Sequence, residues 1–246
     1  MNCNHVVVDQ WSRGSSPVHR RDARAKLAAL LVFLIALATA ARALPLFAGA
    51  LFLMLVAALA WARIPITGAL ARAALVLPFT AVFAGICWLA GDPARGISLV
   101  LKSYLSALAV LLVVSTTPLP ALLRGFGMTG APRFLLEVGQ FLYRYLFVIS
   151  EEAQHMSKAA AARGASVRQW IGQGQRFRAA AGALAVLFAR SYTRAEDVHQ
   201  AMLARGFDGH LPMLAASRFR ASDAIFATVA SLAPWALRLA AERVLQ

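Results

Sequence analysis

The sequence predicts an all-α membrane protein with about five transmembrane helices and a domain of amphipathic helices inserted before the last of them. Hydrophobic residues make up 60% of the 246 residues, whereas soluble domains contain about 45–50% apolar residues. These residues are concentrated in blocks of helical length, which favours membrane spans. Basic residues flank and separate the blocks and give a net charge of +14, as is typical of cytoplasmic membrane loops.

The first two predicted spans follow a polar tail, residues 1–25, in which we expect no cleaved signal peptide. The first apolar block, Leu27–Ala41, is short against the ~20 residues that usually span a bilayer. Its basic entry, Arg20–Lys26, can lengthen it because long cationic side chains reach the headgroups. The second block is Leu44–Ala62. The predicted topology depends on the first block spanning.

Three further apolar blocks complete the set of spans. The third is Ala73–Ala90, in which Pro78 predicts a local kink. The fourth is Ile97–Thr117, with Lys102 near one end, where its amine can reach the membrane interface. The last is Ser222–Leu239.

Between the fourth and last blocks no stretch is both long and apolar enough to span, and this segment holds thirteen of the 25 Lys and Arg residues but only six acids. Basic residues accumulate on the cytoplasmic side. We therefore predict a multi-pass protein of the inner membrane with its N-terminus and inserted domain in the cytoplasm and its C-terminus outside. The predicted organisation is a tail (1–25), four transmembrane helices (26–117), the cytoplasmic domain (118–221) and the last transmembrane helix with the C-terminus (222–246).

Two amphipathic helices in the inserted domain share one design, because each ends in Ala-Arg-Gly. The first begins at Pro132, a residue tolerated in a first turn, and ends at Ala162-Arg163-Gly164. The second begins near residues 175–176 and ends at Ala204-Arg205-Gly206. Glycine stops a helix by adopting a left-handed conformation. Each arginine is therefore predicted to be the last side chain of a helical face.

Apolar residues recur at three- and four-residue steps along both helices, which predicts one apolar stripe on each. The first stripe is Phe134, Val138, Phe141, Leu142, Tyr145 and Ile149, and the second is Leu184, Leu187, Phe188, Ser191, Tyr192, Ala195, Val198 and Met202. The faces just ahead of the two arginines include Met156 and Ala160 in the first helix and Val198 and Met202 in the second.

This design suits docking to a partner. Met, Ala and Val can fill a hydrophobic groove, and a guanidinium offers five donors in a planar fork that matches a carboxylate. The alternative is that each arginine only caps its own helix and reaches lipid headgroups. The tripeptide alone decides nothing, because Ala94-Arg95-Gly96 repeats it in an expected short loop.

These residues resemble the T component of energy-coupling factor (ECF) transporters, in its cobalt-type CbiQ branch. Asp22–Leu27 is similar to the family's entry to its first helix, and Tyr143–Val148 with Glu151 and Glu152 is similar to the CbiQ branch. Ala201–Asp208 is close to the family's second coupling motif. The resemblance covers roughly residues 17 to 241, and the tail through Trp11 has no counterpart in it.

The resemblance implies a role in coupling ATP hydrolysis to import. Arg163 and Arg205 would be the coupling arginines, with Ala162, Gly164, Ala204 and Gly206 as their close-approach neighbours. The two helix ends would insert into grooves on a pair of ABC-type ATPases. A separate small membrane subunit (an S component, or an M subunit with an optional accessory N subunit) would bind the substrate. Cobalt, for cobalamin biosynthesis, is the implied substrate, with nickel or a vitamin such as biotin as alternatives.

No catalytic residue, metal site or cofactor is expected on this chain. It lacks the phosphate-cradling GxxxxGK[ST] loop, so ATP and Mg would bind the partner ATPases. Asp92 and Asp223 lie at block ends, where interfacial anchoring explains them, and the two cysteines and five histidines form no ligand pattern. The basic segment lacks interleaved stacking aromatics, so no nucleic acid is expected. A permease that binds its own substrate is a further alternative.

Overall fold

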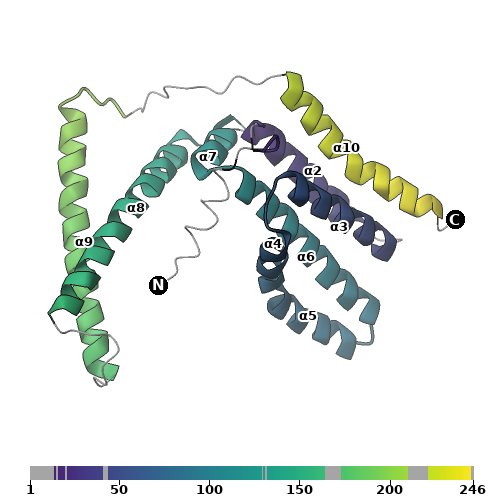
Figure 1. Cartoon of the computed structure of the whole chain (residues 1–246), viewed down its shortest axis with the longest axis horizontal. Helices are drawn as coiled ribbons and strands as arrows, with labels where there is room; N and C mark the ends of the chain where they lie inside the picture. The colour runs from purple at the N-terminus through teal and green to yellow at the C-terminus, as the bar shows by residue number, and fades with distance from the viewer. Residues whose placement is uncertain are drawn as a thin grey trace. The chain divides into compact units, whose positions relative to one another are not determined.

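Figure 1 shows the computed structural model of the chain, which describes residues 14, 16–19, 21–40, 44–128, 130, 132–163, 173–209 and 221–244. Every regular element in these ranges is a helix, so the all-helical prediction is confirmed for them. The chain divides into two compact units, one formed by Met1–Ala131 with Ser217–Gln246 and the other by Pro132–Ala216.

The first unit holds the apolar helices. Its elements are α2 (Ala23–Thr39), α3 (Leu44–Trp61), α4 (Ile66–Ala73), the 3-10 turn η1 (Ala74–Val76), α5 (Leu77–Leu89), α6 (Pro93–Thr116), α7 (Leu119–Met128) and α10 (Ala221–Val244). Within the described residues, three stretches are long and apolar enough to cross a membrane, namely Ile66–Leu89, Pro93–Thr116 and Ala221–Ala240, and Leu46–Trp61 is a shorter apolar helix. The count of five spans stays a prediction.

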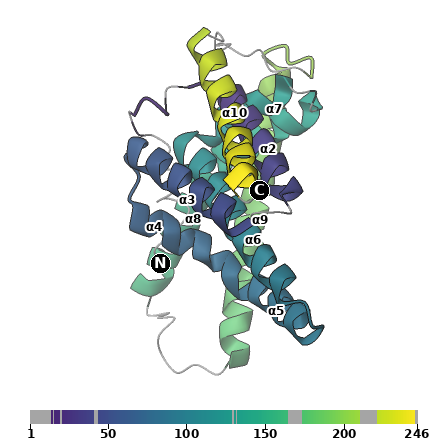
Figure 2. The ribbon, with the colours of Figure 1, turned by 90° about the vertical axis from the view of Figure 1, so that its right-hand side faces the viewer.

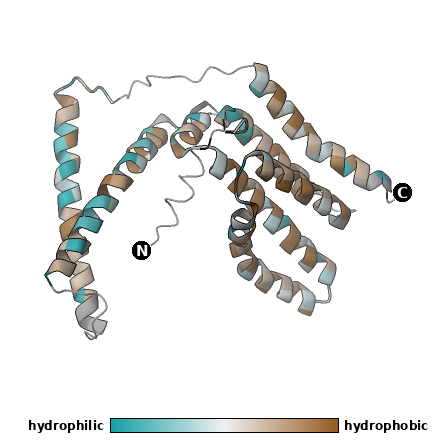
Figure 3. Ribbon diagram, in the orientation of Figure 1, coloured by the Kyte–Doolittle hydropathy of each residue, from teal (hydrophilic) through white to brown (hydrophobic). Residues whose placement is uncertain are grey.

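The core of this unit lies where α2, α3 and α6 pack together. Leu37 of α2, Leu51 of α3 and Leu108 of α6 are almost completely buried, and Ala48 and Ala109 let the helices approach closely. Lipid tails are as apolar as these side chains, so such a core gains mainly from close packing. Large apolar side chains also cover the outside of the unit, for example Phe79 of α5 and Leu53 of α3. Figure 3 shows this apolar character along the ribbons.

The third predicted span begins earlier than expected, at Ile66 rather than Ala73, and contains a 3-10 turn just before Pro78. Pro78 has no N–H to donate to the carbonyl of Ala74, four residues earlier. The N–H of Leu77 donates to that carbonyl instead, in the tighter 3-10 pattern. The kink predicted at this proline therefore takes the form of one tightened turn ahead of it.

The α5–α6 hairpin corrects one expectation, because Ala94-Arg95-Gly96 lies in the first turn of α6 and not in a loop. Gly91 supplies the turn with a φ of +83°, and the Asp92 carboxylate caps α6 by accepting from the Arg95 N–H and pairing with its guanidinium at 2.9 Å. A Cβ at position 96 would lie 3.0 Å from the Ala84 carbonyl oxygen, so glycine allows the two helices to touch.

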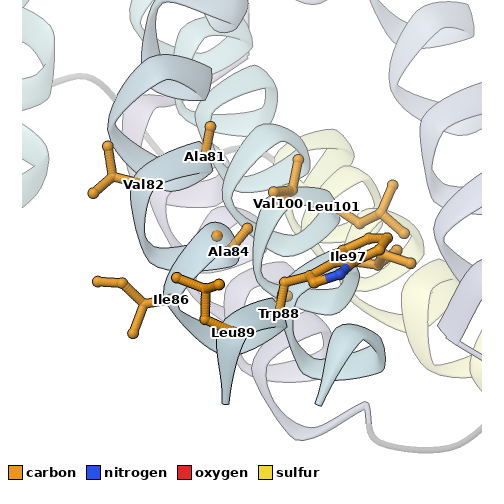
Figure 4. Close-up of a pocket in the computed structure, with 11 residues that line it drawn as sticks. Ala81, Val82, Ala84, Ile86, Trp88, Leu89, Ile97, Val100 and Leu101 are labelled. Atoms are coloured by element: carbon orange, nitrogen blue, oxygen red, sulfur yellow. The ribbon is translucent and has the colours of Figure 1, made fainter. Parts of the chain in front are cut away.

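An open apolar groove of about 710 Å³ lies along this hairpin. Figure 4 shows its lining, which comes from both helices and includes Ala81, Ile86 and Trp88 of α5 and Ile97 and Val100 of α6. The lining is almost entirely apolar, as expected for a surface that faces lipid or a membrane partner.

The second unit is built from two long helices, α8 (Arg133–Ala162) and α9 (Gln173–Leu203). Both helices carry polar residues along much of their length, which Figure 3 shows in teal. Figure 2 gives a second view of the ribbon. The predicted absence of a span in this part of the chain agrees with the described spans, none of which lies in α8 or α9.

Candidate functional site

The C-terminal end of α9 is closed by a glycine-dependent cap. Gly206 has a φ of +79°, and its N–H donates to the Leu203 carbonyl at 2.9 Å. The N–H of Phe207 donates to the Met202 carbonyl at 3.1 Å. These two bonds and the left-handed glycine make a Schellman motif. The predicted glycine stop at Gly206 is therefore confirmed.

This cap bears on the two roles considered for Arg205, which are docking to a partner and capping its own helix. The backbone N–H of Arg205 donates to the Met202 carbonyl at 3.0 Å, and the cap supplies further backbone donors to Met202 and Leu203. Backbone donors therefore already satisfy the Met202 and Leu203 carbonyls, the last two of α9. The side chains of Ala204 and Arg205 and the backbone at Gly206 are exposed. This arrangement leaves the helix end accessible to a partner.

The end of α8 is similar in its described part. The N–H of Arg163 donates to the carbonyls of Ala159 and Ala160, both at 3.2 Å, and its φ of −87° and ψ of 10° end the helix. Ala162 and Arg163 are exposed. Gly164, the predicted stop of this helix, lies outside the described residues.

The faces ahead of the two arginines are only partly covered. Met156 of α8 and Val198 and Met202 of α9 are half-buried, and Ala160 is exposed. The predicted stripes are more exposed farther from the ends, where Phe188 is 73% exposed. Exposed apolar surface of this extent is typical of a surface that binds a partner or a membrane.

The helices α8 and α9 cross, and an ion pair between Glu152 and Arg190 joins them. Figure 1 shows them running in roughly opposite directions past this crossing. Arg163 lies eleven residues beyond Glu152, and Arg205 lies fifteen residues beyond Arg190. At ~1.5 Å per residue, the two arginines are carried roughly 16 and 22 Å from the crossing on separate helices. The structure therefore presents two separate helix ends and not one shared site.

The sequence patterns missed a polar cluster in the first unit, at the first turn of α2. Lys26 is 3% exposed and Asp223 of α10 is 5% exposed. The expectation that Asp223 is an interfacial anchor is corrected by this burial, since its carboxylate accepts from the Asp22 N–H at 3.4 Å. The available signal was the spacing of Asp22 and Lys26, which places both on one helical face ahead of an apolar run.

Comparison with known proteins identifies the family. Residues 14–214 match the CbiQ family model, described as cobalt transport protein. The cobalt transport protein CbiQ of Rhodobacter capsulatus is 31% identical over 142 residues, which cover 57% of this chain and 55% of that protein. The chain therefore spans about half the length of this relative in the match. Because the family model covers most of the sequence, the chain belongs to the CbiQ family of cobalt transport proteins.

Proposed function

We propose that this chain is the transmembrane coupling (T) subunit of an ECF-type ABC importer. It would not catalyse a reaction itself, and would transmit the ATP-driven motion of two partner ATPases to a separate substrate-binding membrane subunit. The observation that carries the proposal is the pair of exposed helix ends at Arg163 and Arg205, held apart on two crossed helices. Two separate ends suit two ATPase grooves.

Docking at these ends would use a charged tip and an apolar face. The guanidinium of Arg205 can bind a carboxylate at the rim of a groove through two parallel hydrogen bonds. The half-buried Val198 and Met202 can enter the groove behind it. The exposed backbone at Gly206 allows the partner to approach closely. When ATP binding closes the ATPases, their grooves would move the two helices.

Cobalt is the substrate that the family and the relative's name support. We propose that a small S or M subunit, with an accessory N subunit as an option, binds the cobalt ion, and that nickel or a vitamin remains the alternative substrate. Affinity purification from the native membrane should recover one or two ABC ATPases and this subunit. Cobalt binding to the purified chain alone would instead favour a permease that binds its own substrate.

Charge reversal at the α9 end tests the coupling role. We expect Arg205→Glu to abolish ATP-driven cobalt uptake, because the guanidinium would be replaced by a group that repels a partner carboxylate. Arg205→Ala should weaken ATPase binding by about 1–3 kcal/mol, as for a moderate hot spot. Uptake is measured in membranes that contain equal amounts of each variant.

The control is Arg95→Glu, which reverses the charge in the other Ala-Arg-Gly copy. Arg95 is 82% exposed and lies at the start of α6, not at the end of a helix. Uptake should stay normal in this variant. Normal uptake by the Arg205→Glu protein would reject the docking role.

A further inference from the structure

The first turn of α2 is a junction at which three other elements meet. We name it the α2 junction and define it by Asp22, Lys26, Thr116, Thr117, Gly125 and Asp223. These residues come from α2 and the residue before it, the end of α6, α7 and the start of α10. All of them lie in the first unit.

Lys26 joins α2 to the end of α6. Its Nζ donates to the Thr116 carbonyl at 2.8 Å and to Thr117 Oγ1 at 2.9 Å. All three residues are at most 3% exposed. A lysine is almost never buried to this degree unless its ammonium is paired. Here the ammonium satisfies the Thr116 carbonyl, the last of α6, which has no partner within its own helix.

Asp22 joins α2 to the start of α10. Its carboxylate caps α2 by accepting from the Arg24 N–H at 3.0 Å. Its own N–H donates to the Asp223 carboxylate at 3.4 Å, and Arg21 pairs with the same carboxylate at 3.7 Å. Asp223 lies in the first turn of α10, where a negative charge is favoured by the helix dipole.

Gly125 brings α7 against the same turn. A Cβ at this position would lie 3.0 Å from Leu27 Cδ1 and 3.5 Å from the Ala23 Cβ. The two helices therefore touch at the glycine. α7 is thus held on α2 beside the Lys26 contacts.

The chain passes between the two units close to the elements that form the α2 junction. The chain enters the amphipathic unit at Pro132, just after α7, and leaves it at Ala216, just before α10. Both covalent connections between the two units are therefore anchored on one turn of α2. Each connection therefore leads to an element, α7 or α10, that contacts this turn of α2.

We propose that Lys26 is a positioning residue that makes the end of α6 and the α6–α7 connection move with α2 as one rigid body, so that motion of the coupling helices is transmitted to the membrane helices. This inference rests on the function proposed above. Lys26 acts through the backbone of Thr116 and the hydroxyl of Thr117, with no contact to substrate or ATPase required.

The first test measures cobalt taken up per ATP hydrolysed by the reconstituted complex in liposomes. Lys26→Met should lower this ratio about tenfold, within the usual range of coupling between sites. Lys26→Arg keeps the positive charge and the hydrogen-bond donors, so this variant should retain most of the native ratio. Lys102→Met is the matched control, since Lys102 also ties α6 to α2, donating to the Ala38 carbonyl at 3.0 Å at the far end of α2. Its ratio should stay unchanged.

If Lys26 only stabilised the fold, Lys26→Met would lower the amount of assembled complex but leave the cobalt taken up per ATP unchanged. Thr117→Val removes one of the two Lys26 contacts and should give an intermediate ratio, even if the Lys26→Met protein assembles poorly. An unchanged ratio in Lys26→Met and in Thr117→Val would overturn the proposal.

A reversible covalent link gives the sharper test. The Cβ separation of 3.5 Å at Ala23 and Gly125 suits a disulfide. The pair Ala23→Cys with Gly125→Cys, in a chain without Cys3 and Cys87, should form one. Oxidation should restore the ratio in the Lys26→Met background, and reduction should abolish it again. Oxidised protein that retains Lys26 should transport normally.

Failure of rescue, or arrest of transport by the disulfide in the Lys26 protein, would overturn the rigid link. The two proposals fail separately. If Arg205→Glu abolishes uptake but Lys26→Met leaves the ratio unchanged, only the junction is refuted. If Arg205→Glu leaves uptake normal, the coupling function itself is refuted.

Discussion

Gly206 is the residue on which the shape of the α9 end depends. With its φ of +79°, it occupies a region that costs an alanine roughly 1–2 kcal/mol. An alanine here would therefore destabilise the hydrogen-bonded cap that holds Ala204 and Arg205 in place. The glycine therefore acts on docking through the helix end and not through a contact of its own.

We expect Gly206→Ala to loosen this cap and weaken ATPase docking up to about tenfold, the effect of roughly 1.4 kcal/mol. Hydrogen exchange at the Phe207 amide should speed up by a similar factor, because that amide donates to Met202. Gly206→Asn should behave like the native chain, since asparagine tolerates the left-handed region.

A glycine inside α9, Gly182, supplies a control for which alanine should be stabilising. Gly182 has no neighbour within 4 Å and no left-handed φ. Gly182→Ala should therefore stabilise α9 by about 0.5–1 kcal/mol. Equal docking by the Gly206→Ala and native chains would show that the cap is not needed.

Single residues also show what sequence patterns could and could not predict. The stop at Gly206 was predictable because a glycine after an amphipathic stripe is a local signal. The burial of Lys26 and Asp223 was not, because their partners lie 90 and 201 positions away along the chain. Only the packing of α2 against α6 and α10 brings them together.

At the scale of elements, the sequence predicted which segments are helical better than where they begin. The third span starts at Ile66 because Pro65 precedes the first turn of α4, and Arg72 is contained in the helix. The Ala94-Arg95-Gly96 loop became a first turn because Asp92 caps it. In both places a residue just ahead of the helix, a proline or a capping aspartate, set the boundary, and hydropathy alone does not detect such start signals.

At the crossing of α8 and α9, an ion pair between Glu152 and Arg190 joins the two helices. Exposed pairs contribute about 0.2–1 kcal/mol. Glu152→Arg should weaken ATPase docking slightly by bringing two guanidinium groups together. The double variant with Arg190→Glu should restore it.

A double-mutant cycle on docking affinity measures this coupling, and we expect roughly 0.5–1 kcal/mol. Glu151→Lys is the control, because Glu151 lies near His155 on its own helix and does not bridge to α9. Coupling of Arg190 to Glu151 as strong as to Glu152 would contradict the role of the pair.

At the scale of the whole molecule, composition was sufficient for the fold class but not for the number of spans. The apolar blocks predicted an all-helical membrane protein, and in the part of the chain that the structure describes three stretches are long and apolar enough to cross. α2 has 17 residues, about 25 Å at the helical rise, against a hydrocarbon core of roughly 30 Å. Whether α2 spans decides on which side of the membrane the coupling ends lie.

Labelling from the two sides of the membrane tests the five-span topology. In a chain without Cys3 and Cys87, we introduce single cysteines at the exposed positions Pro17, Gln200 and Arg243. Four spans separate Pro17 from Gln200, so both should react with an impermeant maleimide only after the membrane is opened. Arg243→Cys lies beyond the fifth span and should react in intact cells. Reaction of Pro17→Cys alone from outside would mean that α2 does not cross, and reaction of Gln200→Cys from outside would remove the coupling ends from the ATPases.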